Sequence, residues 1–299
     1  MKLIKQVLSR IAHFSTSKSR PEKLSERQAA AVDQALHSGI LRDIQHTIME
    51  FSVMDRTRAI SFNRPSTDPD HVQRVERERF KIRLAGSDPD LHRSAGMLIE
   101  KMYGWRGYKV SGSVPGKQTG DPLTITTLVF GNHGAPVGTA TLRFDGPRGL
   151  LADELYGPEL AVLRAQDRRI VEYCKLAIDR TYVDSQKIVA SLMNVFYTYA
   201  TAAGYTDAVI EVNPRHVSYY VSRAAFECIG EERVCPRVNA PAALLRLDYD
   251  VVARQVELYG GRKNDPAAGK SLYRYFLVGE DQAGLSDRLL GETGPVQEG

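Results

Sequence analysis

Runs of apolar and polar residues divide the chain into predicted strands and helices. Short apolar or alternating runs predict strands, and apolar positions three or four residues apart predict helices. The predicted strands cover residues 80–84, 123–130, 137–143, 170–178 and 208–212. The predicted helices cover residues 26–51, 89–103, 185–203 and 251–259, with a helix or helical pair over 271–290. The pattern therefore favours a fold that mixes strands and helices.

Polar segments divide the chain into three predicted parts. Residues 63–70 form a polar linker, so residues 1–70 are predicted to be an N-terminal helical extension with its linker. Residues 71–250 contain most of the predicted strands and form the main domain. Residues 251–299 are predicted to be a C-terminal helical extension that ends in a disordered acidic stretch.

Residues 207–230, DAVIEVNPRHVSYYVSRAAFECIG, predict a strand, a turn, a short helix and a second strand. Glu211 interrupts the apolar run of the first strand, and Asn213-Pro214 ends that strand and starts the helix. Residues four apart share a face of a helix. Two stripes are therefore predicted, His216 with Tyr220 and Arg215 with Tyr219 and Arg223. An acid/base stripe and a cationic stripe are expected just beyond the end of a strand.

Composition indicates a globular protein with no metal centre and no nucleic-acid partner. The 299 residues, 42% of them hydrophobic, are enough to bury a core. The net charge of +4 is mild and no binding motif accompanies it, so nucleic-acid binding is not expected. Cys174, Cys228 and Cys235 are an odd count without metal-ligand spacing, which suits a reducing compartment.

No segment of the sequence reaches the roughly 18 apolar residues needed to span a bilayer. The first residues, MKLIKQVLSRIAHF, are amphipathic and basic. Such a helix could lie on a membrane surface or dock on the domain. We therefore expect a cytoplasmic protein, with peripheral membrane contact through the N-terminal helix left open.

The string NPRHVSYY, followed by Phe226 and GEERVCPRVNAPAALLRLD, resembles a known family. An Asn followed seven residues later by a Tyr resembles the last motif of the GNAT acyltransferase superfamily. The fuller string resembles the long-chain N-acyl amino acid synthases of the FeeM type, which are bacterial. The resemblance covers about residues 79–289 and is most specific over 211–248. One departure is Ala225, where the family usually has Gly; alanine accepts most backbone conformations except those with positive φ.

The resemblance implies a GNAT-like α/β fold, with a mixed, mostly antiparallel central sheet flanked by helices, related to the LuxI-type autoinducer synthases. It also implies an acyl donor linked to phosphopantetheine. In most CoA-dependent GNAT enzymes the loop before the long helix is rich in glycine, so that backbone N–H groups hold a pyrophosphate. Residues 180–186, RTYVDSQ, contain no glycine. This absence favours acyl carrier protein over acyl-CoA as the donor.

Making an amide from a thioester requires a base that frees the amine, and the sequence offers three candidates. These are Glu211, Glu172 and His216. Each has a structural alternative: Glu211 could pair with Arg215 or Arg223, Glu172 could pair with Lys175 or a nearby Arg, and His216 could be a helix-capping or surface residue. The residues alone leave the identity of the base open.

The reaction also requires a proton for the leaving thiolate and donors for the oxyanion. Tyr220 matches the GNAT position whose hydroxyl commonly faces the thioester sulfur, so the resemblance implies that it donates this proton. Its alternative is an aromatic anchor in the core. Backbone N–H groups around Ala177 to Asp179 are the expected oxyanion donors.

Binding residues are expected for both substrates. The guanidinium fork suits a carboxylate, and the candidates for binding the amino acid are Arg215, Arg223 and Arg237. The candidates for binding the acyl donor are Ala177, Ile178, Asp179, Arg180, Lys187, Met193 and Phe196. Met193 and Phe196 could line an apolar tunnel together with Leu150, Leu151, Leu155, Leu192 and Tyr197, or these residues could be plain core.

The function that the resemblance implies is transfer of a long-chain acyl group from an acyl carrier protein thioester to the α-amine of an amino acid. An N-acyl homoserine lactone synthase would use the same donor with S-adenosylmethionine as acceptor. A CoA-dependent GNAT N-acetyltransferase is disfavoured by the loop without glycine. A non-catalytic acyl-binding module is the alternative from a different class of protein.

Overall fold

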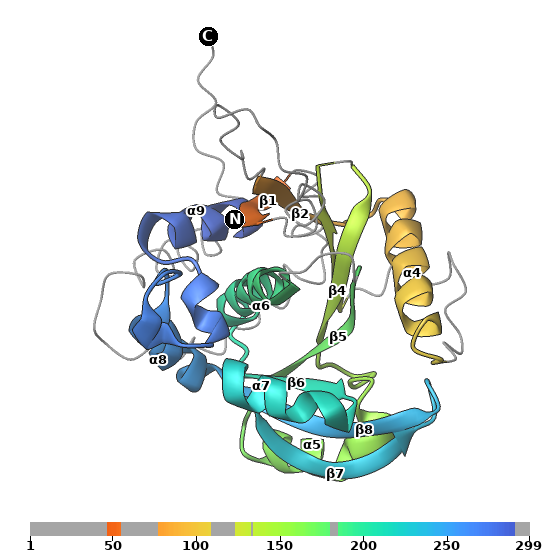
Figure 1. Cartoon of the computed structure of the whole chain (residues 1–299). Coiled ribbons are helices and arrows are strands. Elements are labelled where there is room, and N and C mark those ends of the chain that lie inside the picture. The colour runs from red at the N-terminus through yellow and green to blue at the C-terminus, as the bar shows by residue number, and fades with distance from the viewer. Residues whose placement is uncertain (1–46, 55–76, 109–122, 133, 180–184, 291–299) are drawn as a thin grey trace, which may run out of the picture.

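The computed structural model describes residues 47–54, 77–108, 123–132, 134–179 and 185–290 (Figure 1). The strands are β1 (Thr47–Met54), β2 (Arg77–Leu84), β3 (Thr124–Phe130), β4 (Pro136–Phe144), β5 (Ile170–Ile178), β6 (Asp207–Val212), β7 (Glu227–Cys235) and β8 (Ala240–Asp248). The α-helices are α4 (Pro89–Gly104), α5 (Asp153–Ala165), α6 (Ser185–Ala202), α7 (Val217–Ala224), α8 (Tyr249–Tyr259) and α9 (Gly279–Leu290). The short 3₁₀ turns are η2 (Pro214–His216), η3 (Pro266–Ala268) and η4 (Leu272–Tyr275).

The strands form one eight-stranded sheet in the order β1-β2-β3-β4-β5-β6-β8-β7. Neighbouring strands are antiparallel except β5 and β6, which run parallel and are connected through α6. The prediction of a mixed, mostly antiparallel sheet with helices is confirmed. The single parallel pair lies near the middle of the sheet, so each of its strands also has an antiparallel neighbour.

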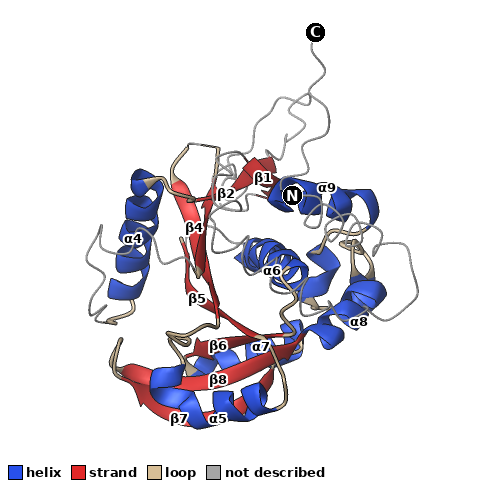
Figure 2. Cartoon of the chain, turned by 180° about the vertical axis from the view of Figure 1, so that it is seen from behind, coloured by secondary structure: helices blue, strands red, loops and turns tan. Residues whose placement is uncertain are grey.

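Helices cover both faces of the sheet. On β4 and β5, α4 lies against one face and α6 against the other (Figures 1 and 2). Helix α5 packs against the part formed by β6, β8 and β7, where the Tyr156 hydroxyl donates to the carbonyls of Glu231 (3.0 Å) and Ala242 (2.7 Å). Gly230 makes room for this ring, because a Cβ there would lie 2.7 Å from it.

The C-terminal elements share the main core with the sheet. Leu272, Phe276 and Leu285 belong to the same buried cluster as the apolar residues of β2, β4 and α6. The side chain of Asn194, buried in α6, accepts a hydrogen bond from Leu277 N (2.9 Å) and donates one to Gln282 Oε1 (3.1 Å). These contacts fix the C-terminal segment against α6.

The predicted elements of the main domain agree closely with the structure. Strand β5 has the predicted bounds, and α4 covers the predicted helix, with Asp88 as its cap accepting from Asp90 N (2.8 Å) and Leu91 N (3.2 Å). The helix predicted to continue through residue 51 is wrong at that end, because residues 47–54 form β1 and pair with β2. Pairing across the sheet supplies partners that local periodicity does not reveal.

Several predictions lie outside the described residues. These are the N-terminal helix with its membrane contact, the linker at 63–70, Arg180 in the loop before α6, and the acidic end. Within the described ranges, no helix is both long enough and apolar enough to cross a membrane.

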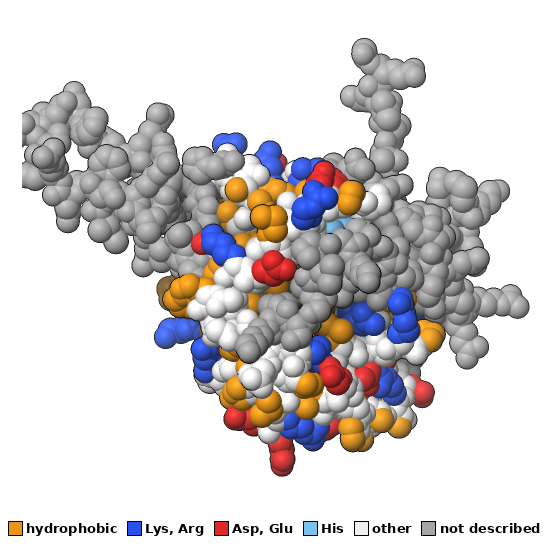
Figure 3. Space-filling model, turned by 90° about the vertical axis from the view of Figure 1, so that its right-hand side faces the viewer, with side chains coloured by type: hydrophobic (Ala, Val, Ile, Leu, Met, Phe, Trp, Pro, Cys, Tyr) orange, Lys and Arg blue, Asp and Glu red, His pale blue; other side chains and the backbone are white. Residues whose placement is uncertain are grey.

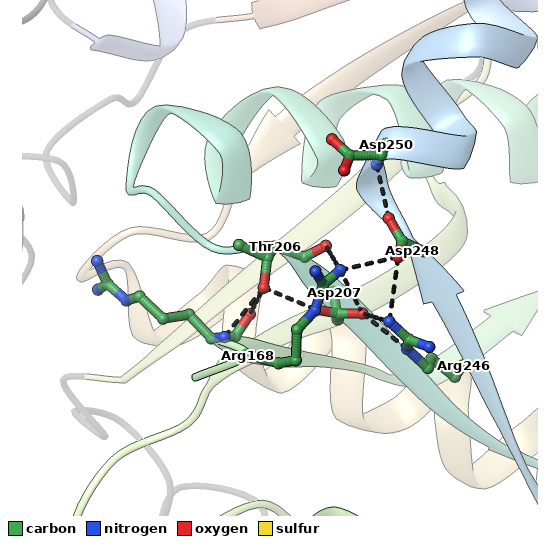
Figure 4. Close-up of polar contacts among 7 residues, drawn as sticks. Arg168, Thr206, Asp207, Arg246, Asp248 and Asp250 are labelled. Carbon is green, nitrogen blue, oxygen red and sulfur yellow. Dashed lines mark hydrogen bonds and ion pairs between the residues drawn. The ribbon is translucent and has the colours of Figure 1, made fainter. Parts of the chain in front are cut away.

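A buried ion-pair network joins the strands at the end of the sheet where β5 and β6 begin (Figure 4). Asp207 is fully buried and accepts from Arg168 Nε (2.5 Å) and Arg246 Nε (2.8 Å). Asp248, the cap of α8, accepts from the same two arginines at 2.9 and 3.1 Å. The network ties β6, β8 and the start of β5 together.

Replacing Asp207 should therefore be costly. We predict that Asp207→Asn lowers the free energy of unfolding by about 3 kcal/mol or more, because two arginines lose a buried carboxylate partner. Asp250→Asn, at an exposed position beside the network, should change it by less than about 0.5 kcal/mol. Denaturant unfolding of both variants measures the difference, and equal effects would contradict a structural role for the network.

Candidate active site

The strands β5 and β6 part shortly after they begin. Their parallel pairing extends over three positions only and ends at Glu172 and Val209. Beyond that point β5 continues to Ile178 along β4, and β6 continues to Val212 along β8. We call this parting the splay; Figure 1 shows β4 and β5 leaving it in one direction and β6 and β8 in another. Side chains at the splay can therefore face a substrate instead of a neighbouring strand.

Strand β5 carries a β-bulge next to the splay. Thr139 pairs with Ala177 and Thr141 pairs with Cys174, so Lys175 and Leu176 oppose the single residue Ala140. Lys175 adopts a positive φ of 54°. A bulge re-aims backbone groups and is frequent beside active sites. The backbone N–H groups of this bulge are therefore the candidate oxyanion donors.

Glu172 is buried at the point where the strands part. Its side chain is inside the protein, with 1% of the residue exposed, and its Oε2 accepts from Leu151 N at 2.6 Å. Ala152, at the start of α5, provides no side-chain cap, so Glu172 takes over part of that role. Burial, with the nearby charge of Glu211, raises the pKa of Glu172 to about 7. Glu172 is therefore poorly placed to touch a substrate.

Glu211 lies across the splay on β6 and is held by Arg237. Arg237 donates to Glu211 Oε2, to the carbonyl of Leu151 (2.8 Å) and to Glu154 Oε2 (2.5 Å). The partner foreseen for Glu211 was Arg215 or Arg223, and both are wrong: the ion pair is with Arg237, 26 residues away in the sequence. The other oxygen, Glu211 Oε1, is buried and has no hydrogen-bond partner. Burial raises the pKa of Glu211 despite the arginine.

The two carboxylates and Arg237 form one electrostatic unit. Each of Glu172 and Arg237 shifts its pKa in response to Glu211. The charge of Arg237 lowers the pKa of both acids, while the charge of Glu211 disfavours ionisation of Glu172. One buried oxygen of Glu211 remains available to accept a proton. This makes Glu211 the better placed of the two predicted acids for general-base work.

The predicted Asn-Pro turn is present and positions α7. Asn213 caps the turn by accepting from Arg215 N (3.3 Å) and also donates to the carbonyl of Pro241 (3.3 Å). The short helix is divided, with His216 at the end of η2 and Tyr220 inside α7. Burial lowers the pKa of His216, so the imidazole is mostly neutral.

Tyr220 is enclosed by aromatic rings. Its ring centroid lies 5.3 Å from that of Tyr219 and 5.6 Å from that of Phe226, both edge-on. Burial raises the pKa of its hydroxyl, which therefore remains protonated. A protonated phenol can donate to a departing thiolate, and it also serves as an anchor, so both expectations for Tyr220 stay open.

The backbone of Ala225 adopts a conformation that alanine disfavours. It ends α7 in the left-handed conformation, with φ of 56° and ψ of 28°. This positive-φ conformation is the exception noted from the sequence, the one that alanine tolerates poorly. The turn that leads from α7 into β7 carries backbone strain that glycine would avoid.

The C-terminal end of α4 also reaches this region, which the sequence did not predict. The Tyr103 ring lies 6.1 Å from that of Tyr108, edge-on, and burial raises the pKa of Tyr103 to about 12. The neighbours that affect Tyr103 include Cys174 of β5 and Cys235 of β7. Nothing in the string YGWRGY distinguishes these residues from an ordinary aromatic helix end, so only the packing reveals them.

The three predicted carboxylate-binding arginines lie in different surroundings. Arg237 is occupied by Glu211 and Glu154. Arg223 donates to Gln186 (3.2 Å) and stacks on Tyr219. Arg215 donates to the hydroxyl of Tyr108 at 3.2 Å. The structure thus brings Arg215 and Arg237 to the site region and leaves Arg223 against α6.

The predicted donor-binding residues do not form one surface. Ala177 and Ile178 pair with β4, and the N–H of Asp179 donates to the carbonyl of Val137 (2.8 Å), which leaves it unavailable to an oxyanion. Lys187 lies over the ring of Phe51. Met193 and Phe196 are buried in the main core, 5% and 1% exposed.

The predicted acyl tunnel likewise falls into two parts. Leu150 and Leu155 belong to a smaller cluster with α5, whereas Leu192, Met193, Phe196 and Tyr197 belong to the main core. These side chains therefore do not line a common surface in this conformation.

A cavity of about 670 Å³ lies away from the splay, beside the first residues of β5. Arg164, on its wall, forms ion pairs with Asp145 and Asp153 at 2.7 Å. Because its guanidinium is already satisfied, we assign no chemistry to this cavity. Among the described residues, no group of three or more His, Cys, Asp or Glu side chains could hold a metal ion.

Comparisons with known proteins agree with this geometry. The family model described as N-acyl amino acid synthase FeeM matches residues 94–248. The solved structure of FeeM, an N-acyl amino acid synthase from uncultured soil microbes, has 29% identity and a TM-score of 0.53, covering 58% of this chain and 92% of FeeM. A comparison with curated proteins found no match.

Two further solved structures are more distant. The AHL synthase LasI has 14% identity and a TM-score of 0.40, covering 57% of this chain and 90% of its own. A putative N-acetyltransferase from Lactobacillus plantarum has 13% identity and a TM-score of 0.40, covering 57% and 98%.

The mixed sheet with its splay, and the similarity to FeeM, define an acyltransferase with a GNAT-like fold. The chain belongs to the FeeM family of N-acyl amino acid synthases, whose model matches more than half of its residues. The resemblance inferred from residues 211–248 is confirmed.

The raised pKa of Glu172 predicts a pH-dependent stability. The folded protein keeps this proton up to about pH 7, whereas the unfolded chain releases it near 4.5, so the free energy of unfolding falls as the pH rises between these values. Glu172→Gln removes this contribution. Denaturant unfolding measures the free energy of unfolding of both proteins at pH 5 and at pH 8. Between these two pH values, the free energy of the variant relative to wild type should rise by on the order of 2 kcal/mol. Parallel pH profiles for the two proteins would contradict the assignment.

The strained cap of α7 gives a second prediction. Ala225→Gly should raise the free energy of unfolding by about 1 kcal/mol, because relief of the left-handed strain exceeds the entropy cost of glycine. Ala225→Val should lower it, since a β-branched residue tolerates positive φ even less. Denaturant unfolding of both variants measures these changes, and a glycine variant less stable than wild type would contradict the proposed strain at Ala225.

Proposed function

We propose that the protein transfers a long-chain acyl group from an acyl carrier protein thioester to the α-amine of an amino acid. The observation that carries this proposal is Glu211, a buried carboxylate at the splay with a raised pKa and one oxygen without a hydrogen-bond partner. Membership of the N-acyl amino acid synthase family supports the reaction class. The loop at 180–186, without glycine, supports a carrier-protein donor over CoA.

Glu211 is assigned the role of base. An α-amine has a pKa near 8, so a carboxylate needs to remove only one weakly held proton, directly or through a water. The freed nitrogen then attacks the carbonyl carbon of the thioester, the C–N bond forms, and the carbonyl oxygen becomes the oxyanion. The N–H groups of the β5 bulge are assigned to this oxyanion.

Tyr220 is assigned the role of acid. Collapse of the oxyanion breaks the C–S bond, and the phenol donates its proton to the departing thiolate of the pantetheine arm. The nitrogen carries one proton in excess after the attack and releases it to the phenolate, so the amide becomes neutral and Tyr220 is restored. His216 is not required as a base in this scheme, and Glu172 acts by fixing the start of α5 through its hydrogen bond from Leu151 N. The products are the N-acyl amino acid and the free thiol.

Purified protein tests the proposal directly. It should be incubated with dodecanoyl or hexadecanoyl thioesters of acyl carrier protein or CoA and an equimolar mixture of the twenty amino acids, followed by mass spectrometry of the lipid extract. We expect N-acyl amino acids, formed faster from the carrier-protein thioester. Lactones formed on adding S-adenosylmethionine, acetylation from acetyl-CoA, or no new amide would each contradict the proposal.

Two substitutions test the assigned roles. Glu211→Gln should lower kcat by about 10²- to 10⁴-fold and remove the rise of the rate with pH, while Tyr220→Phe should lower kcat by at least about tenfold. Arg93→Gln, at an exposed ion pair on the far end of α4, is the matched control and should keep wild-type activity. Unfolding curves of each variant separate loss of chemistry from loss of fold. An active Glu211→Gln enzyme would contradict the base assignment.

A further inference from the structure

The end of α4 and the start of α7 meet through Arg215. Its Nη2 donates to the hydroxyl of Tyr108 (3.2 Å), and its Nε donates to Nε2 of His216 (3.2 Å). The contact with Tyr108 joins residues 107 positions apart in the sequence. A guanidinium is thus held in a fixed orientation where the two helices approach each other.

Arg106 brings a second positive charge to the same place. It follows α4 directly, and its N–H donates to the carbonyl of Tyr103 (2.9 Å). Its charge lowers the pKa of His216, as that of Arg215 does, and it also acts on Tyr220. The N–H of Tyr108, whose hydroxyl accepts from Arg215, donates to the same carbonyl of Tyr103 (3.1 Å), so Arg106 lies on the turn that contacts Arg215.

Among the described residues, these two arginines lack a carboxylate partner. In the part of the chain that the structure describes, neither Arg106 nor Arg215 forms an ion pair, whereas the arginines at 164, 168, 233, 237 and 246 all do. Both are exposed. Side chains of both charge signs are mixed on the side of the molecule where α4 lies (Figure 3).

Two arginines on segments that contact each other, one of them hydrogen-bonded to His216, suit a small anion. Their planar forks match a carboxylate, and charge-assisted hydrogen bonds are the stronger kind. The position also suits the proposed reaction. Arg215 follows Glu211 by four positions, beyond the end of β6 and the cap at Asn213, so this arginine and the proposed base lie at the same end of β6.

We propose that Arg106 and Arg215 bind the carboxylate of the acceptor amino acid. The inference rests on the proposed function, and it names Arg106, which no sequence motif indicated. Tyr108 positions Arg215, and the bound carboxylate leaves the adjacent α-amine directed toward Glu211. Arg237 and Arg223 have other partners and do not take this role.

Equilibrium binding tests the site without requiring turnover. N-dodecanoylglycine carries the carboxylate, and N-methyldodecanamide lacks only that group. We expect wild type to bind the first at least about tenfold more tightly by calorimetry, and Arg106→Gln and Arg215→Gln each to reduce this preference about tenfold. Binding of N-methyldodecanamide should stay unchanged, which a general loss of structure would not allow. Arg93→Gln, which removes a charge from the other end of α4, should keep the preference.

Steady-state kinetics test the carboxylate site in a second way. With the amino acid that wild type acylates fastest, both variants should raise KM for the amino acid about tenfold and leave KM for the acyl donor unchanged. A preference for the carboxylate that survives both substitutions would overturn the inference while leaving the acyltransfer proposal intact. If wild type instead prefers the carboxylate ligand but forms no amide product, the proposed function is overturned and the carboxylate site stands.

Discussion

The candidate site depends on where β5 and β6 stop pairing. Three parallel pairs hold the strands together, and the ion-pair network of Asp207 fixes them at their first residues. Beyond Glu172 and Val209 each strand follows a different antiparallel neighbour. The bulge in β5 and the carboxylate of Glu211 thereby face a common space. A longer parallel ladder would have joined the two edges and covered both groups.

Where the two strands part, polar side chains are buried, and the structure supplies hydrogen bonds to some of their oxygens but not to all. Glu172 receives a backbone N–H from Leu151, and Arg237 is shared among Glu211, Glu154 and a carbonyl. One oxygen of Glu211 receives nothing. A buried carboxylate oxygen without a partner is costly in a structural role. The same oxygen becomes useful when a substrate ammonium or a water can occupy the splay.

Local sequence patterns predicted much of the fold and part of the site. The apolar run of β5, the periodicity of α6 and the Asn-Pro turn all depend on near neighbours, and the structure agrees with each. The pairing of Glu211 with Arg237, the bulge at Lys175, the approach of Tyr103 and Arg106, and the strand at 47–54 depend on contacts between distant segments. Periodicity carries no information about such contacts, and lysine or alanine at positive φ runs against residue preference.

The elements outside the matched family range pack around α6. Residues 94–248 contain the splay, both acids, α7 and Arg106, while β1, β2, α8 and α9 lie outside that range. Arg288 of α9 donates to the carbonyl of Ile48 in β1 (2.8 Å), and Asn194 of α6 binds the segment before α9. These contacts enclose α6, which connects β5 to β6 and must hold both strands while they diverge. The added elements therefore pack against the helix that connects β5 to β6, and none of the side chains assigned to the chemistry belongs to them.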